Sequence, residues 1–210
     1  VVGRSSAGAR DNGVQVGVTA VDPHTGGIRA MYGGNDGQGF NYATSPQMPG
    51  SSFKVVTLAA ALENGIGLGT NIDSSPYVAE GGSVLNNSEG MTCGSCSLAE
   101  ATKQSLNTSF YRLQDMRPEG PVSTQKMAFA LGADQSSLAD ENGFVAKAIT
   151  LGSYGISTAE MAGMMGTIAN NGTKIKRHIV QSIKTDNGNT TYDFKDKGTR
   201  VISDYTAGEI

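Results

Sequence analysis

The sequence predicts an α+β protein, a mixed three-layer domain in which helices flank an antiparallel sheet. Three observations lead to this fold class. Strand signals open the chain between residues 14 and 32, helix signals fill most of residues 51–172, and strand signals return between residues 178 and 194. Neither an internal repeat nor a linker divides the 210 residues, so we expect one domain.

The first predicted element is a hairpin. Val14 to Val21 is rich in β-branched residues with a period of two, which is typical of a strand. Asp22 to Gly27 predicts a turn, and Ile28 to Tyr32 predicts the returning strand. A loop rich in Gly, Asn and Gln follows from Gly33 to Pro49.

Helices are predicted next, each from a start or a stop signal. The first extends from Ser51 to about Asn64 and ends at Gly65, because glycine readily adopts the left-handed conformation after a helix. Gly65 to Cys96 has weak signals and is predicted as a long loop. The other signals are a capping box at Ser97–Glu100 with a helix to about Ser105, a cap at Thr108, Pro121 as a first residue with a stop at Gly132, and a capping box at Ser157–Glu160 with a stop at Gly172.

The last predicted elements are a second hairpin and a helix start. His178 to Ile183 and Thr190 to Phe194 flank Asn187-Gly188, a dipeptide typical of tight hairpin turns. Ser203 to Glu209 carries helix-start signals, but the chain stops after Ile210, so no helix is expected there.

Charge and composition argue against several classes of function. The formal net charge is −3, with 16 basic and 19 acidic residues, which offers no basic surface for nucleic acid. No apolar run is long enough to predict a membrane span. The two histidines, His24 and His178, lack the spacing of metal ligands, so we expect neither a metal nor a cofactor.

The two cysteines lie in Cys93-Gly-Ser-Cys96. This spacing occurs in redox motifs, in half zinc sites and in local disulfides. Zinc would need two further ligands, and a redox motif would need the first cysteine at a helix start after a strand, whereas polar loop sequence precedes this pair. A structural role is favoured.

The strongest chemical signal is Ser51-Ser-Phe-Lys54 at the head of an almost purely apolar helix. A helix that is apolar on every side is buried. Burial and the positive end of the helix dipole both favour the neutral amine of Lys54, which is a base. Ser51 lies one turn earlier, so Lys54 can take its proton and activate it as a nucleophile, while helix N–H groups stabilise an oxyanion.

The Ser-x-x-Lys pattern alone is weak, because chance matches are common. Ser123-Thr-Gln-Lys126 is a second copy, and we interpret it as the solvated face of a more polar helix. A second element strengthens the first copy. Ser105-Leu-Asn107 falls where a helix ends, so its hydroxyl could relay a proton and its carboxamide could hold a substrate amide. Taken alone, it would be interpreted as a helix end with an Asx turn.

Together these residues resemble the penicilloyl serine transferases, which share Ser-x-x-Lys and Ser-x-Asn in this order. The transpeptidase domain of class A, bifunctional penicillin-binding proteins is a closer resemblance, and it covers nearly the whole chain. The matching strings are Phe40-Asn-Tyr-Ala-Thr44, Pro49-Gly-Ser-Ser-Phe-Lys54, Ser105-Leu-Asn-Thr108 and Leu151-Gly-Ser-Tyr-Gly-Ile-Ser157, besides the opening hairpin.

The resemblance implies a peptidoglycan D,D-transpeptidase. Ser51 would attack the carbonyl between two D-alanines of a stem peptide, and β-lactams would acylate the same residue. Lys54 would be the base, Ser105 would help to protonate the leaving D-alanine, and Asn107 would hold the donor peptide. The family works outside the cytoplasmic membrane, anchored to it in the full-length protein, and this location suits a disulfide between Cys93 and Cys96.

One family motif is missing. The family has Lys-Thr/Ser-Gly on a strand lining the site, and the nearest match is Lys184-Thr-Asp186, which we interpret as a coincidence. We therefore expect residues 1–210 to be the N-terminal part of one transpeptidase domain, with the remainder of that domain as a companion chain and the sheet incomplete. Three alternatives stay open: a D,D-carboxypeptidase, a β-lactamase, or a β-lactam-binding sensor or scaffold without turnover.

Overall fold

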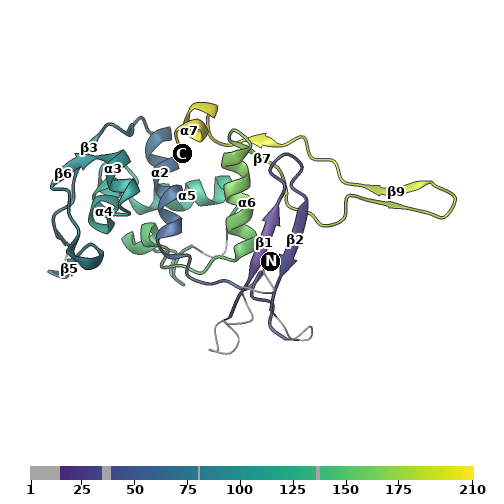
Figure 1. Cartoon of the computed structure of the whole chain (residues 1–210), viewed down its shortest axis with the longest axis horizontal. Coiled ribbons are helices and arrows are strands. Elements are labelled where there is room, and N and C mark those ends of the chain that lie inside the picture. Colours follow the sequence, from purple (N-terminus) through teal and green to yellow (C-terminus); the bar gives the residue numbers. More distant parts are fainter. Residues whose placement is uncertain (1–14, 35–38, 80, 136–137) are drawn as a thin grey trace. The chain divides into compact units, whose positions relative to one another are not determined.

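The computed structural model describes residues 15–34, 39–79, 81–135 and 138–210, and Val14 lies outside them (Figure 1). Helices alternate with short antiparallel sheets, so the predicted α+β class is confirmed. Within the described ranges each sheet has two strands, in agreement with an incomplete sheet. No helix among these residues is both long and apolar enough to cross a bilayer.

The chain forms two compact units. The first contains the described residues up to Gln47, with 131–133 and 156–201. Its elements are β1 (Val18–Val21), β2 (Ile28–Tyr32), α6 (Thr158–Ala169), β7 (Thr173–Lys174), β8 (Ser182–Lys184), β9 (Thr190–Asp193) and β10 (Thr199–Arg200).

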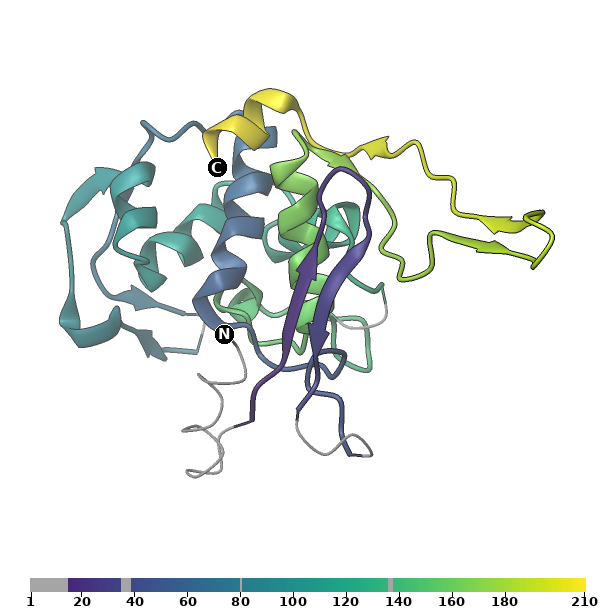
Figure 2. The same ribbon diagram turned by 45° about the vertical axis from the view of Figure 1, so that its right-hand side comes forward.

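In the first unit, helix α6 packs against the opening hairpin (Figure 2). Strands β1 and β2 are antiparallel, with Val18 opposite Tyr32. The predicted capping box forms: Ser157 Oγ accepts from Glu160 N at 3.1 Å, and Glu160 Oε2 accepts from Ser157 N at 2.9 Å. This cap satisfies backbone donors at the start of α6 and fixes its first turn.

The second predicted hairpin forms between β8 and β9, but its first strand starts at Ser182 rather than at His178. The backbone of His178 instead bonds to the turn of the first hairpin, at Gly26 O and Ile28 N. Its ring also stacks on Phe194, with 3.6 Å between ring centroids. The backbone of His178 therefore pairs with the first hairpin, while its ring packs at the base of the second, outside the β8–β9 ladder.

The second unit contains residues 48–130, 134–155 and 202–210, apart from those not described. Its helices are η1 (Gly50–Phe53), α2 (Lys54–Glu63), η2 (Ser88–Gly90), α3 (Leu98–Lys103), α4 (Asn107–Asp115), α5 (Pro121–Leu131, whose last residue belongs to the first unit), η3 (Lys147–Leu151) and α7 (Asp204–Glu209). Its strands are β3 (Asn71–Asp73), β4 (Tyr77–Val78), β5 (Val84–Leu85) and β6 (Ser95–Ser97).

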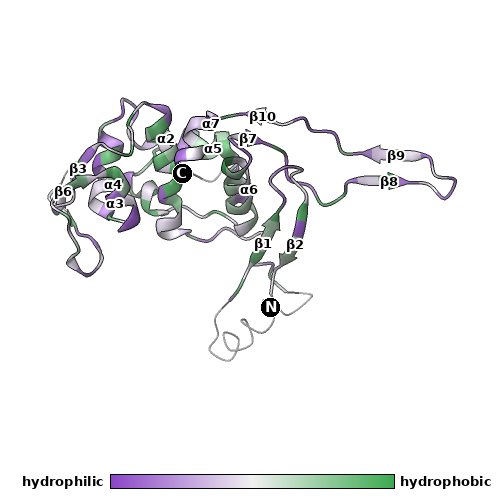
Figure 3. Ribbon diagram, turned by 45° about the horizontal axis from the view of Figure 1, so that its top comes forward, coloured by the Kyte–Doolittle hydropathy of each residue, from purple (hydrophilic) through white to green (hydrophobic). Residues whose placement is uncertain are grey.

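The core of the second unit forms around α2, in which residues 55–62 are apolar except for Thr57 (Figure 3). Leu58 and Leu62 of α2 pack with Leu98 of α3 and with Phe110 and Leu113 of α4. As predicted, α2 is buried and is followed by Gly65 with a φ of +78°. This packing places the head of α2 next to the segment that joins α3 to α4.

Two sequence-based predictions in the middle of the second unit are wrong. The predicted loop from Gly65 to Cys96 contains the 3-10 helix η2, the strands β3, β4 and β5 and most of β6, and these strands of two or three residues are too short to show an alternating pattern. Thr108 is not a cap: α4 starts at Asn107, and the Thr108 hydroxyl bonds to Ser74 O.

A short helix, α7, does precede Ile210, although no helix was expected there. Ser203 Oγ accepts from Thr206 N at 3.0 Å, which caps its first turn. Glu63, at the end of α2, accepts bonds from both the backbone and the hydroxyl of Ser203. The end of α2 therefore fixes the start of α7.

Candidate active site

Lys54 lies at the centre of the candidate site, at the start of α2. Its Nζ lies 3.2 Å from Ser51 Oγ, 2.9 Å from Ser105 Oγ, 2.5 Å from Ser105 O and 2.8 Å from Asn107 Oδ1. The four residues named from the Ser-x-x-Lys and Ser-x-Asn patterns are thus brought together around one amine. They come from η1, α2, the α3–α4 connection and α4, all within the second unit.

The amine of Lys54 is buried, and only 4% of the residue is exposed. Burial lowers the pKa of Lys54 from 10.5 to about 8, because a charged amine loses hydration there. None of the four hydrogen-bonded oxygens belongs to a carboxylate, so none of these partners carries a negative charge that would raise the pKa of Lys54 again. The ring of Phe110 lies 5.5 Å from Nζ.

The four contacts can be shared by either protonation state of Lys54, and the neutral amine has two N–H groups and one lone pair. Ser105 O and Asn107 Oδ1 can only accept, so they take the two N–H groups. The charged amine donates to the hydroxyls of Ser51 and Ser105, and once it has lost its proton either hydroxyl can donate to its lone pair instead. The arrangement can therefore move a proton from one serine to the other through the amine.

The nucleophile candidate lies at the surface, in contrast to its lysine. Ser51 is exposed and belongs to the turn η1, which continues directly into α2. Gly152, which ends η3 with a φ of +69°, packs directly on Gly50. A Cβ added at Gly152 would lie 2.5 Å from Gly50 N and O, so only glycine fits against the turn that holds Ser51.

Ser105 has an unusual backbone. Its φ is +55°, in the left-handed region, although it is not a glycine. This conformation turns the chain sharply between α3 and α4, so that both the carbonyl and the hydroxyl of Ser105 face Lys54. Ser105 is exposed, so its hydroxyl is also accessible from solvent.

Sequence reasoning did not identify three features of this site: the main-chain oxygen of Ser105, the Phe110 ring and the contact of Gly152 with Gly50. The oxygen and the ring have no signal in sequence spacing. Gly152 did have a sequence signal, because it lies in the Leu151-to-Ser157 string that carried the family resemblance. That string did not indicate which residue Gly152 would contact.

The other patterns singled out in the sequence have ordinary surroundings. Lys126 is exposed and forms an ion pair with Glu119 at 2.5 Å, so it is engaged away from Ser123. Ser123 Oγ is buried without a hydrogen-bond partner among the described residues, so only the lysine of this copy lies on the solvated face that the sequence predicted. Lys184 ends β8 and is exposed. Cys93 and Cys96 form a disulfide.

Comparison with known proteins identifies the family. A family model described as the penicillin binding protein transpeptidase domain matches residues 16–210. Penicillin-binding protein 1A of Mycolicibacterium smegmatis is 37% identical over 96% of this chain, and that of Mycobacterium tuberculosis is 39% identical over 88%. The chain covers only 27% and 23% of the length of these two relatives.

Solved structures agree with the sequence matches. The penicillin-binding protein PonA1 of Mycobacterium tuberculosis superposes with a TM-score of 0.86 and 37% identity. The match covers 91% of this chain and 52% of that one. The same protein in complex with penicillin V gives a TM-score of 0.86 and 38% identity. The chain therefore belongs to the family of penicillin-binding protein transpeptidase domains, a family of serine acyltransferases.

Proposed function

We propose that this chain carries the acylation machinery of a peptidoglycan D,D-transpeptidase, with Ser51 as the nucleophile. The observation that supports it best is the buried Lys54 amine between the hydroxyls of Ser51 and Ser105. A neutral amine in that place is a base for one serine and a proton donor, through the other serine, for a leaving group. The relatives' names and the penicillin V complex of PonA1 support the same reaction class.

In the first step, Ser51 Oγ attacks the carbonyl carbon between two D-alanines and gives its proton to Lys54 Nζ. Backbone N–H groups at the start of the helix have no intrahelical acceptor and can stabilise the oxyanion. The C–N bond then breaks. The proton passes from Lys54 to the leaving amine through the Ser105 hydroxyl, and an acyl-enzyme remains on Ser51.

In the second step, an amine of a neighbouring stem peptide attacks the ester carbon and releases Ser51. The nitrogen loses a proton to the site, and Ser51 Oγ regains one, so the site returns to its starting state. Asn107 Nδ2 would hold the donor peptide by an amide hydrogen bond. β-Lactams would acylate Ser51 in place of the donor, and the complex of PonA1 with penicillin V supports binding of such a ligand. This substrate lies outside the cytoplasmic membrane, and we propose that location, with a membrane anchor, for the full-length protein.

Intact-protein mass spectrometry of the complete protein with penicillin tests the nucleophile. The unmodified protein should gain the mass of one penicillin, and Ser51→Ala should gain none. Ser123→Ala is the matched control from the second Ser-x-x-Lys copy and should still form the adduct. An adduct that survives Ser51→Ala would refute the assignment.

A second measurement distinguishes the reaction from its alternatives. Rapid loss of the penicillin adduct would indicate a β-lactamase. A stable adduct together with cross-linking of stem peptides would indicate a transpeptidase. A stable adduct with release of D-alanine but no cross-link would indicate a carboxypeptidase, and a stable adduct without turnover would indicate a sensor.

A further inference from the structure

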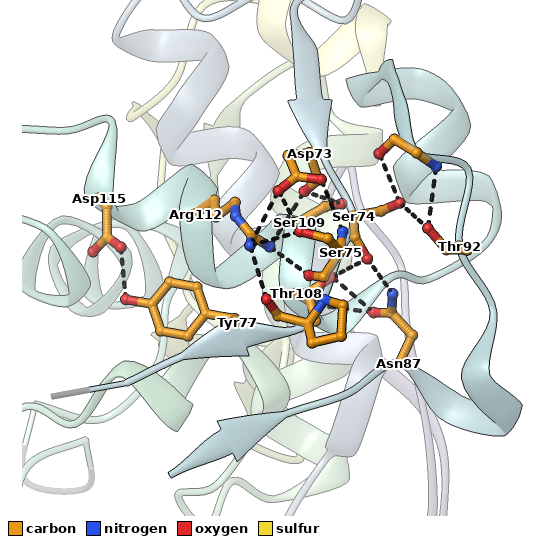
Figure 4. Close-up of polar contacts among 12 residues, drawn as sticks. Asp73, Ser74, Ser75, Tyr77, Asn87, Thr92, Thr108, Ser109, Arg112 and Asp115 are labelled. Atoms are coloured by element: carbon orange, nitrogen blue, oxygen red, sulfur yellow. Dashed lines mark hydrogen bonds and ion pairs between the residues drawn. The ribbon is translucent and has the colours of Figure 1, made fainter. Parts of the chain in front are cut away.

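Helix α4, which carries Asn107, has no cap of its own. The residue before it is Leu106, whose side chain offers no acceptor to the first N–H groups of the helix. These N–H groups need an acceptor from elsewhere when a helix start is buried. Asn87 supplies one: its Oδ1 accepts from Thr108 N at 3.0 Å (Figure 4).

Asn87 is itself held from its other end. Its Nδ2 donates to Ser74 O at 2.9 Å and to Met91 O at 2.8 Å. Thr108 Oγ1 lies 2.9 Å from Ser74 O and 3.1 Å from Asn87 Oδ1, so it closes a ring of three residues. Only 8% of Asn87 is exposed. A buried amide with both ends bonded has one orientation, which makes it a rigid spacer.

Ser74, the residue to which this ring of hydrogen bonds is attached, is also held by several hydrogen bonds. Ser74 Oγ accepts from Cys93 N at 2.9 Å, lies 2.8 Å from Thr92 Oγ1 and donates to Gly94 O at 2.9 Å. The disulfide from Cys93 to Cys96 closes the same segment. The start of α4 is thus attached to a covalently closed turn and not to a loose loop.

We propose that Asn87 is a positioning residue, which caps α4 from a distant segment and so holds Asn107 Oδ1 against Lys54. Thr108, the residue that Asn87 holds, directly follows Asn107, and Asn107 Nδ2 also donates to Asn86 O at 3.4 Å. Asn107 Oδ1 lies 2.8 Å from Lys54 Nζ. A small shift of the helix start would change this distance directly. The inference rests on the proposed function, because its effect appears in acylation.

The test measures the second-order rate of acylation of the complete protein by a fluorescent penicillin, with the melting temperature of each variant. Asn87→Ala should lower the rate about tenfold or more, because a displacement of about 1 Å can cost that much. Asn87→Leu has the same number of side-chain heavy atoms but no acceptor, so it should show a similar loss without leaving a cavity. Asn87→Asp keeps an acceptor for Thr108 N but turns the donor to Ser74 O and Met91 O into a charged oxygen, so it should also slow acylation.

Ser109→Ala is the matched control. It removes another bond from α4 to the same segment, from Ser109 Oγ to Asp73 O at 3.2 Å, without touching the capped N–H. Its melting temperature should fall, while its acylation rate should stay within about twofold. If Asn87 served stability alone, its variants would behave like Ser109→Ala: their melting temperatures would fall, but their acylation rates would stay within about twofold.

A double-mutant cycle completes the test. If Asn87 acts through Asn107, adding Asn87→Ala to Asn107→Ala should lower the rate by less than about twofold. Full additivity, or unchanged acylation in Asn87→Ala and Asn87→Leu, would each overturn the proposal. Failure of the proposed function is distinct, because the unmodified protein would then form no adduct at Ser51.

Discussion

Asn107 Oδ1 lies 2.8 Å from Lys54 Nζ, although the two residues are 53 positions apart in the chain. The contact fixes the amine but brings no net negative charge to it. A carboxylate in this position would favour the ammonium form, whereas an amide oxygen leaves the effect of burial dominant. The pKa of about 8 for Lys54 agrees with this arrangement.

The first prediction concerns the pH dependence of acylation. A pKa of about 8 means that Lys54 loses its proton as pH rises through 8. The neutral fraction should grow from about a tenth at pH 7 to about nine tenths at pH 9, so the acylation rate should rise about tenfold and then level off. The rate with a fluorescent penicillin, measured from pH 6 to 10, checks this. Lys54→Arg should be almost inert throughout, because guanidinium stays protonated. A flat profile would contradict the base role.

The second prediction concerns Asn107→Asp. A carboxylate next to Lys54 Nζ should raise the pKa of the lysine, so acylation at pH 7 should fall and its rise should move to higher pH. The same pH series measures the midpoint. Asn107→Ala is the control, since it removes the contact without adding charge: its rate should fall, but its midpoint should not move upward. An unmoved midpoint in Asn107→Asp would show that residue 107 does not face the lysine.

The third prediction concerns Gly152→Ala. The new methyl group would lie 2.5 Å from Gly50 N and O, at a backbone φ of +69°. We expect a loss of about 1–3 kcal/mol in the free energy of unfolding, measured with urea, because both the contact and the conformation are unfavourable. Acylation should also slow, because the turn that holds Ser51 must move. Gly69→Ala is the matched control: Gly69 has open space around its Cβ position and needs no left-handed backbone, so its effects should be small.

The fourth prediction concerns the disulfide between Cys93 and Cys96. Thiol titration of the denatured, unreduced protein should find no thiols, and reduction should release two. The bridge closes a loop with a sequence separation of only 3. Chain entropy then predicts a stabilisation of about 2 kcal/mol, less than for long loops. Comparison of the unfolding free energy with that of the Cys93→Ser, Cys96→Ser double variant measures it. Two thiols before reduction would exclude the bridge.

Sequence patterns predicted the helices best, because their start signals are local. Ser157 with Glu160 and Pro121 each act within one turn of the helix that they begin, and the structure starts a helix at each signal. The start of α4 was misplaced because its cap comes from Asn87, 21 positions from Thr108. A local pattern cannot contain such a partner.

Part of the candidate site was also open to sequence reasoning. The spacing of Ser51 and Lys54 places them one helical turn apart, and α2 is apolar enough to imply that its first lysine is buried. The approach of Ser105 and Asn107 to Lys54 depends on the fold of the second unit. Resemblance to a family supplied that expectation, since no rule of spacing connects residues about 50 positions apart.

The left-handed backbone at Ser105 makes stability and activity favour different residues at this position. Serine at a φ of +55° carries strain of about 1–3 kcal/mol, which glycine would relieve. Its hydroxyl, however, contacts the Lys54 amine, and glycine has none. Two selections from a library randomised at this position should therefore give different residues. Selection for heat resistance should enrich glycine or asparagine, and selection for reaction with penicillin should retain serine. The position would then belong to the class in which an enzyme keeps a less stable residue because its chemistry requires it.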